Sequence, residues 1–197
     1  MPKVTEEYRR ERRDEIIAGA LRTFHRKGFA AASMADILEE TGVSAGALYG
    51  HFKSKEELVK EVASSIVGGR IVDAEAVLAL DPLPSPGELV AVVMRGALRE
   101  LKQPGMLVQM WGQAVTEPEF QTVAASIIAR LEHVFHRHIS RWQQQEHGLS
   151  GRKADAVATE QTPLFISACQ GFMIQLSIKP GFDIDEYLSA AAKYLPR

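Results

Sequence analysis

Three neighbouring histidines and one cysteine are the side chains in this sequence best suited to metal binding or nucleophilic catalysis. In a helix, His133 and His136 would share a face and His138 would point elsewhere. No cysteine and no pair of carboxylates at local spacing completes a tetrahedral metal site around them. Cys169 has no histidine near it in the sequence, which also contains no nucleophile elbow, glycine-rich phosphate loop or metalloprotease motif. We therefore expect no catalytic residue, no metal and no cofactor.

Side chains that could contact nucleic acid lie together in residues 33–52, SMADILEETGVSAGALYGHF. Ser33, with Asp36 three residues later, predicts the capped start of one short helix, and Ser44 predicts the start of another. Gly42 between them permits the positive φ of a sharp turn. Two short helices joined in this way are typical of a helix-turn-helix, whose second helix enters the major groove of DNA. A helical corner with no nucleic-acid role has the same spacing and stays an alternative.

The stretch from Ile16 to Leu58, about a quarter of the chain, resembles the tetracycline-repressor (TetR) family of bacterial regulators. Within it, residues 42–58 follow the pattern GVSxGxLYxHFxSKEEL, which is specific to that family. The matching positions are Ile16, Ala20, Phe24, Gly28, Phe29, Ser33, Ile37, Gly42, Val43, Ser44, Gly46, Leu48, Tyr49, His51, Phe52, Lys55, Glu56 and Leu58. The resemblance implies a DNA-binding transcriptional regulator, a repressor that a small and largely apolar ligand releases from a palindromic operator.

The resemblance also implies which residues contact double-stranded DNA. The implied set is Ser33, Met34, Ser44, Ala45, Gly46, Tyr49, His51, Lys53 and Lys55. Ser33 and the start of its helix would face a phosphate, since a helix N-terminus favours an anion. Tyr49, His51, Lys53 and Lys55 would contact phosphates or base edges. By residue type alone, Tyr49 could instead pack against a neighbour, and the other three could be ordinary surface residues.

The expected recognition helix is unusually poor in side chains that read bases. Its outward positions include Ala45, Gly46 and Gly50, and no arginine, asparagine or glutamine occurs in residues 44–52. Bidentate hydrogen bonding to guanine or adenine is therefore not available from this helix. We expect the DNA sequence to be read by Tyr49, by Ala45 against a thymine methyl group, and through DNA shape.

A cluster of arginines, Arg9, Arg10, Arg12 and Arg13, lies before the first apolar stripe. Residues 1–27 contain eight basic and five acidic side chains, although the net charge of the chain is −2. Any contact with DNA must therefore be local. The cluster could be an arm that reaches a groove or phosphates, or a solvated helix start paired with neighbouring carboxylates.

Helices must position all of these residues, because nearly every apolar segment has helical spacing and no strand is indicated. We expect an all-α protein with nine helices in a TetR-like architecture. Residues 1–53 would form a three-helix DNA-binding domain and residues 54–197 a larger ligand-binding and dimerisation domain, with helix 54–79 connecting them. The second helix is expected to turn Ala35, Ile37 and Leu38 toward its neighbours. Residues 81–87, rich in proline, are the best candidate for a linker, and Pro163 is expected to interrupt or kink the eighth helix.

The resemblance places a ligand cavity and a homodimer interface in the larger domain. Methionines and aromatic residues suit an adaptable apolar pocket, although ordinary core is the alternative for each of them. The pocket candidates are Met94, Met106, Met110, Trp111, Phe120, Leu131 and Phe135. The last two helices are apolar on most sides and must be covered, as in a two-fold four-helix bundle. The interface candidates are Phe165, Cys169, Phe172, Leu176, Leu188 and Ala191.

Composition agrees with a soluble globular protein, since 46% of the residues are hydrophobic and 24% are charged. The charged N-terminus has no apolar segment typical of a secretion signal, and no stretch is long enough to span a membrane. A single cysteine excludes an intramolecular disulfide. We therefore expect a cytoplasmic protein that has no membrane partner. The alternative function is a helical interaction module without sequence-specific DNA binding.

Overall fold

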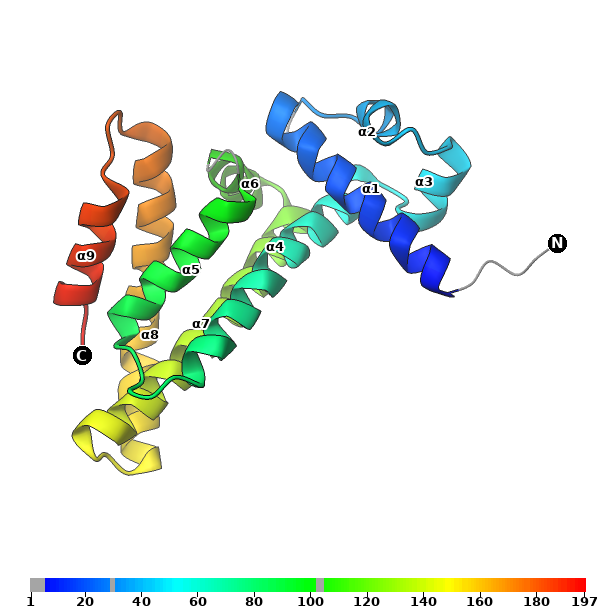
Figure 1. Ribbon diagram of the computed structural model, residues 1–197. Helices are drawn as coiled ribbons and strands as arrows, with labels where there is room; N and C mark the ends of the chain where they lie inside the picture. Colours follow the sequence, from blue (N-terminus) through cyan, green and yellow to red (C-terminus); the bar gives the residue numbers. More distant parts are fainter. Residues whose placement is uncertain (1–5, 29–30, 102–104) are drawn as a thin grey trace.

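The computed structural model describes residues 6–28, 31–101 and 105–197, with backbone alone for 66–68, 70, 71, 100 and 119. Over these residues the chain is helical and contains no strand, which confirms the all-α prediction (Figure 1). The helices are α1 (Glu6–Lys27), α2 (Met34–Thr41), α3 (Ala45–His51), α4 (Lys55–Leu78), α5 (Pro86–Glu100), α6 (Gly105–Thr116), α7 (Pro118–His147), α8 (Gly151–Ile178) and α9 (Ile184–Tyr194). Phe29, one of the positions that resemble the family, lies outside the described residues.

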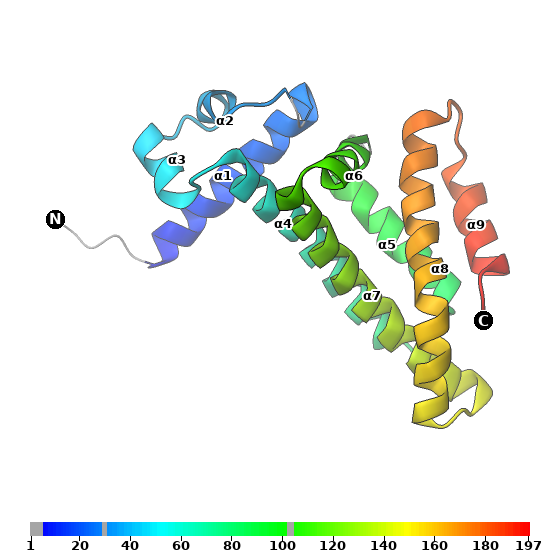
Figure 2. The same cartoon turned by 180° about the vertical axis from the view of Figure 1, so that it is seen from behind.

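Helices α1, α2 and α3 form a small unit at one end of the molecule, and α4 runs from this unit into a larger helical body (Figures 1 and 2). The small unit has its own apolar centre because one face of α1 meets α2 and α3. Ile16 and Phe24 of α1, Ile37 of α2 and Leu48 of α3 are all buried. Phe52, directly after α3, closes this centre. The three-helix organisation expected from the sequence is therefore observed.

Local signals in the sequence determine where α2 and α3 begin and end. Ser33 accepts a hydrogen bond from the Asp36 N–H, and the Asp36 carboxylate accepts one from the Ser33 N–H, so both halves of the capping box form. Gly42 ends α2 with a left-handed φ of 66°, which permits the sharp turn. Ser44 then accepts the Ala47 N–H and begins α3.

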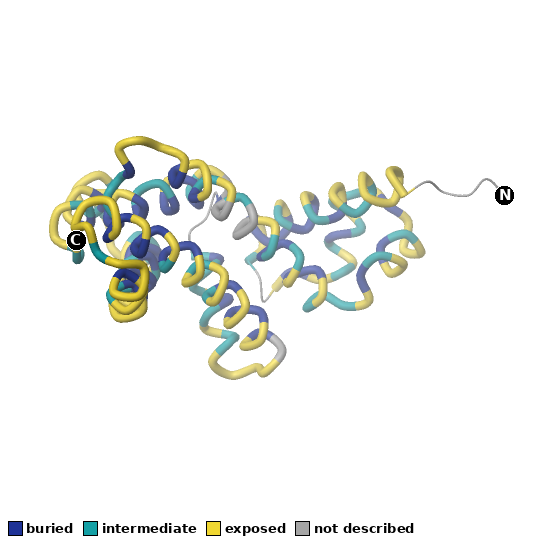
Figure 3. Tube along the Cα trace, turned by 90° about the horizontal axis from the view of Figure 1, so that it is seen from below, coloured by how far each residue is buried: buried dark blue, intermediate teal, exposed yellow. Residues whose placement is uncertain are grey.

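The larger body consists of the remainder of α4 and of α5 to α9. The short connection after residue 147 returns the chain so that α7 and α8 pack side by side (Figure 2). Helix α9 packs mainly on α5, where a side-chain atom added to Gly87 would lie 2.5 Å from the Ala191 carbonyl oxygen. Only glycine allows the two backbones to come this close. The tube in Figure 3 shows that buried positions alternate with exposed ones along most helices.

Two sequence predictions about this body need correction. Residues 81–87, predicted to be a linker, join α4 to α5 inside the body, and Leu83 is buried against Leu78 and Trp142. Helix α8 continues through Pro163 without an interruption. Pro163 lies on the exposed face of α8, where water can reach the carbonyl group that has lost its helical donor.

Candidate functional site

Helix α3 presents a smooth, accessible face. Leu48 points into the core of the small unit and is fully buried, which turns the opposite side of the helix outward. Tyr49 is 51% exposed, and a Cβ atom added to Gly46 or Gly50 would meet no atom within 4 Å. Ala45 is also exposed, as expected from the sequence. The face can therefore approach a large ligand closely, and larger side chains could be introduced on it without a clash.

The residues at the start of α2 are occupied mainly with capping. Ser33 is exposed, but its hydroxyl oxygen already accepts the Asp36 N–H. Met34 is half-buried, and Ala35 is exposed rather than turned toward a neighbouring helix. The prediction for Ala35 was wrong because Ile37, two residues later, points into the core, and positions two apart lie on nearly opposite sides of a helix.

The three basic side chains after α3 have different surroundings. His51 is half-buried with its ring 6.3 Å from the Phe52 ring, measured between centroids. Lys53 is exposed, and its backbone N–H donates to the Glu57 carboxylate at 2.7 Å. The Lys55 ammonium group donates to the Ala32 carbonyl at 3.1 Å and so connects α4 to the segment before α2. Of the two lysines, Lys53 is the one whose side chain is freely accessible.

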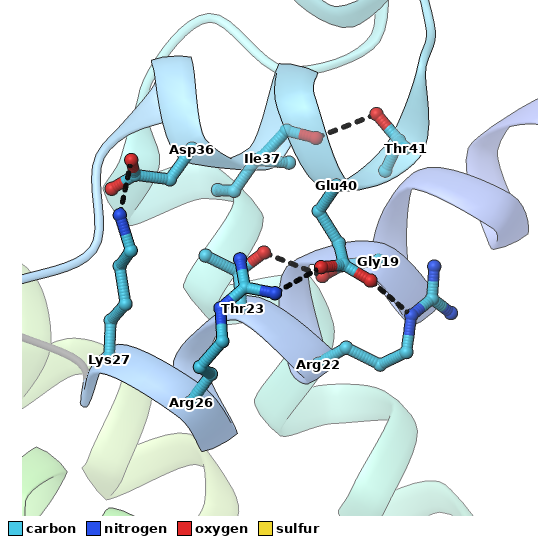
Figure 4. A network of polar contacts seen from close by, with 9 residues as sticks. All are labelled: Gly19, Arg22, Thr23, Arg26, Lys27, Asp36, Ile37, Glu40 and Thr41. Carbon is cyan, nitrogen blue, oxygen red and sulfur yellow. Dashed lines mark hydrogen bonds and ion pairs between the residues drawn. The ribbon is translucent and has the colours of Figure 1, made fainter.

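An ion-pair network that the sequence analysis did not identify fixes α2 against α1 (Figure 4). The Glu40 carboxylate accepts from Arg22 at 2.8 Å and from Arg26 at 2.7 Å. Lys27 donates to the Asp36 carboxylate at 2.7 Å, and with the Ser33 bonds this lowers the pKa of Asp36 to about 2. Hydrogen bonds from Arg22 and then Arg26 likewise lower the pKa of Glu40. The only sequence signal was the spacing of Arg22 and Arg26, which places both on one face of a helix.

The arginine cluster belongs to α1 itself and is not a separate arm. Arg12 forms an ion pair with Glu15 at 2.6 Å and donates to the Tyr8 hydroxyl at 3.2 Å. Arg13 forms an ion pair with Glu61 of α4 at 2.8 Å, and its guanidinium lies over the Phe52 ring at 5.3 Å. The first turns of α1 are therefore held beside α3 and the start of α4.

An apolar cavity of about 60 Å³ lies between α5, α6, α7 and α8. Four of the seven pocket candidates line it, namely Met94, Met110, Trp111 and Leu131. Cys169, which was predicted at the dimer interface, also lines this cavity, and its burial raises the pKa of the thiol to about 12. Gln170 is the one lining residue with an amide side chain, and no charged residue is present in the lining.

The other three pocket candidates lie elsewhere. Met106 lines a second, smaller cavity that also touches Phe24 of α1 and Val59 of α4. Phe135 is fully buried and stacks on Phe165 with the ring centroids 5.7 Å apart. Phe120 is buried near the start of α7 and does not line the first cavity. For these three residues the ordinary-core alternative applies.

Five of the six interface candidates are buried within a single chain. They are Phe165, Cys169, Phe172, Leu188 and Ala191. Phe172 packs edge-on against the rings of Phe182 and Tyr187, and Leu176 alone is partly exposed. These five belong to the interior of one protomer, because α9 and α7 already cover the sides of α8 on which they lie.

The outer face of α8 is apolar and uncovered. Leu164 is 50% exposed, Ile174 39% and Ile178 70%. They recur at helical spacing, so they lie along one side of α8.

The three histidines of α7 do not converge. His133 is exposed, and His136 lies 3.3 Å from the Thr159 hydroxyl. His138 is fully buried, and its Nε2 donates to the Pro84 carbonyl at 2.8 Å. Within the described part of the chain, no three potential metal ligands are close enough to hold an ion. No helix in that part is long and apolar enough to cross a membrane.

Comparison with known proteins identifies relatives that share the small unit. Residues 16–62 match the model of a family described as bacterial regulatory proteins, tetR family. YfiR of Bacillus subtilis, an HTH-type transcriptional regulator, is 43% identical over 61 residues, which are 31% of this chain and 30% of YfiR. The aligned segment thus spans less than a third of that relative. The HTH-type transcriptional repressor AcnR of Corynebacterium jeikeium is 29% identical over 154 residues, 77% of this chain and 74% of AcnR.

The larger body also has counterparts among solved structures. A crystal structure of the multidrug binding protein EbrR complexed with ethidium matches with a TM-score of 0.65. The match covers 93% of this chain and 97% of that one at 18% sequence identity. At this identity the likeness shows the fold alone, so the nine-helix architecture is shared across both the small unit and the body.

Proposed function

The chain belongs to the tetR family of bacterial regulatory proteins, and we propose that it is a homodimeric transcriptional repressor that a small apolar ligand releases from a palindromic operator. The named relatives are regulators and not enzymes, so the proposal includes no catalytic step. A protein that regulates transcription acts where the DNA is, which places this chain in the cytoplasm.

The observation that supports DNA binding best is the exposed, capped face of α3. Ser44 at its start and Tyr49 and Gly50 further along it are exposed, while Leu48 anchors the opposite side. In a helix-turn-helix this face enters the major groove and α2 crosses the backbone. We assign Ala45 and Tyr49 to base edges and Lys53 to a phosphate. Lys55 acts by holding the start of α4 in place, since its ammonium already has an acceptor within the chain.

Selection of bound sequences from random duplex DNA, followed by a salt titration of the selected fragment, tests this assignment. We expect a two-fold symmetric site and an affinity that falls steeply with salt, because phosphate contacts release counterions. Gly50→Arg introduces a base-reading side chain into open space and should change the preferred sequence. Val115→Arg adds the same charge at an exposed position of α6 and is the matched control. Failure to select any sequence would favour a helical interaction module without sequence-specific DNA binding.

The cavity between α5 and α8 supports the ligand part of the proposal. Its lining is apolar apart from the Gln170 amide and the Cys169 thiol, which favours an uncharged, largely apolar guest that makes one hydrogen bond. The volume of about 60 Å³ is smaller than the ~150 Å³ that holds benzene in a protein core. A ligand of ordinary size must therefore move side chains, and the unbranched Met94, Met110 and Met173 are well suited to this.

Release from DNA follows if the ligand binds better to a form of the protein whose recognition helices are wrongly spaced. Met110 and Leu107 of α6 line both the ligand cavity and the smaller cavity against α1 and α4. Movement of α6 thus changes the support of the DNA-binding unit. Only the difference in ligand affinity between the two forms can drive this shift.

A variant with a filled cavity tests the ligand site. Ala97 lines the cavity, and Ala97→Leu adds a volume close to the available space. We expect this variant to bind the selected DNA normally and to lose release by an apolar aromatic probe such as ethidium, which the related EbrR binds. If Ala97→Leu is still released at the same ethidium concentration as the parent protein, the ligand site lies elsewhere.

The exposed apolar face of α8 supports the homodimer. Leu164, Ile174 and Ile178 form a stripe that water does not favour, and a second copy of α8 would cover it. We expect sedimentation equilibrium to show a dimer that Ile174→Asp together with Ile178→Asp converts to a monomer. Val115 is even more exposed at 85%, so Val115→Asp is the matched control and should remain dimeric. A monomeric parent protein at micromolar concentration would contradict this part of the proposal.

A further inference from the structure

The first part of α1 extends beyond the core of the small unit. None of the residues from Glu6 to Glu15 is buried, and the first buried side chain of α1 is Ile16. At 1.5 Å per residue this exposed segment is about 15 Å long. Figures 1 and 3 show it projecting past α3 toward the N-terminus. Apolar burial does not explain why such a segment keeps a defined position.

Two arginines hold the extension in place. Arg13 connects it to Glu61 of α4 through an ion pair and to Phe52 through the face of the ring. Arg12 binds Tyr8 and Glu15 along the same helix. These contacts fix the direction of α1 relative to α3, so the extension and the recognition helix form two walls of one groove.

The groove between these walls has a volume of about 710 Å³ and is positively charged. Its α1 wall contains Arg9, Arg10, Arg12 and Arg13, and Glu6 is the only acidic residue in the lining. The α3 wall consists of small side chains and backbone, from Ser44 to Gly50, followed by His51. A wide groove with cations on one wall and no bulky side chains on the other suits a polyanionic strand.

Arg9 and Arg10 are the cations in this groove that remain available. Both are exposed, and within the described part of the chain neither forms an ion pair or hydrogen bond. Residues 44–52 contain no lysine or arginine. Charge for the phosphates beside the recognition helix must therefore come from another element, and α1 is the element that faces it across the groove.

We propose that the arginine-lined groove holds the sugar-phosphate backbone beside the major groove that α3 enters, with Arg9 and Arg10 pairing with phosphates. The inference rests on the proposed DNA-binding function and adds a contact outside the helix-turn-helix. It also accounts for DNA binding by a chain whose net charge is negative, since the cations are concentrated at one edge of the DNA-binding unit.

The test compares the double variant Arg9→Gln, Arg10→Gln with the parent protein on the selected operator over a range of salt concentrations. Each lost phosphate contact lowers the slope of log K against log salt by about 0.9, so two per chain should lower it by about 1.8. Arg152→Gln with Lys153→Gln removes the same charge from the exposed start of α8 and should leave the slope unchanged. Circular dichroism checks that both double variants are folded.

The outcomes separate the two proposals. If the parent protein selects no DNA, the proposed function fails before the groove is tested. If the parent binds and the Arg9, Arg10 variant has the same affinity and slope, the groove does not hold phosphate and the inference is overturned. The loss should also be equal on operators with A·T-rich and G·C-rich flanks. A loss confined to A·T-rich flanks would show insertion into the minor groove and would overturn the phosphate assignment.

Discussion

Replacement of Gly19 by alanine tests how tightly α1 and α2 are fitted together. Gly19 is buried on α1, and a Cβ atom at this position would overlap Thr41 Cγ2 and lie 3.5 Å from Thr41 Cβ. Thr41 cannot simply rotate, because its hydroxyl donates to the Ile37 carbonyl at 2.7 Å. The two helices must separate or that hydrogen bond must break, and either change displaces α2 from the arrangement that the DNA-binding unit requires.

The expected magnitude is the difference between two opposing effects. Alanine in place of glycine inside a helix gains about 1 kcal/mol, whereas an extra methyl group in a packed contact costs about 1 to 3 kcal/mol. We expect Gly19→Ala to lower the free energy of unfolding by about 1 to 2 kcal/mol. In a Thr41→Ser background the obstructing methyl group is gone and the hydroxyl is kept. There the same substitution should raise the free energy of unfolding by up to about 1 kcal/mol.

Urea unfolding of the parent, the two single variants and the double variant, followed by circular dichroism at one protein concentration, measures this coupling. A fixed concentration is needed because dimerisation contributes to the apparent stability. We expect a coupling free energy of about 1 to 3 kcal/mol between the two sites. If Gly19→Ala is stabilising in the parent background, or equally destabilising in both, the described contact between α1 and α2 is incorrect.

Three further predictions concern the interior. Burial lowers the pKa of His138 below its ordinary 6.5, so its contribution to stability is complete above about pH 6.5 and is lost as the pH falls below that value toward the folded pKa; the free energy of unfolding of His138→Gln should fall less across this range. The raised pKa of Cys169 predicts almost no alkylation by iodoacetamide in the native protein, and rapid modification of the native thiol would contradict its burial. Leu48→Ala should cost about 2 to 5 kcal/mol and weaken DNA binding, and a cost below about 1 kcal/mol would mean that α3 is not anchored there.

The sequence predicts well those features that local chemistry determines. Ser33, Gly42 and Ser44 specify helix ends through bonds to residues a few positions away, so their roles could be inferred without the fold. The start of α1 was not predictable in this way. No apolar residue recurs before Ile16, and what holds the extension is the contact of Arg13 with residues of α3 and α4 that are distant in the sequence.

The distinction between pocket, core and interface could not be drawn from the sequence, because apolar periodicity shows that a face is covered and not what covers it. Phe135 and Phe165 were assigned to a pocket and to an interface, yet they stack on each other inside one chain. Cys169 was assigned to the interface and lines the cavity. In each case the covering element is a helix tens of residues away, whose position depends on the packing of the whole body.

The position of α6 between two cavities has a mechanical consequence. Leu107 and Met110 have empty space on both sides, next to the ligand cavity and next to α1 and α4. Voids lower the stiffness of packing, since lining atoms lose part of their attractive contacts. We therefore expect α6 to be the softest part of the body, with faster amide hydrogen exchange than α5 or α7 and with sensitivity to hydrostatic pressure. A guest that pushes on α6 moves it at little elastic cost, and the force reaches the DNA-binding unit through a short and compressible path.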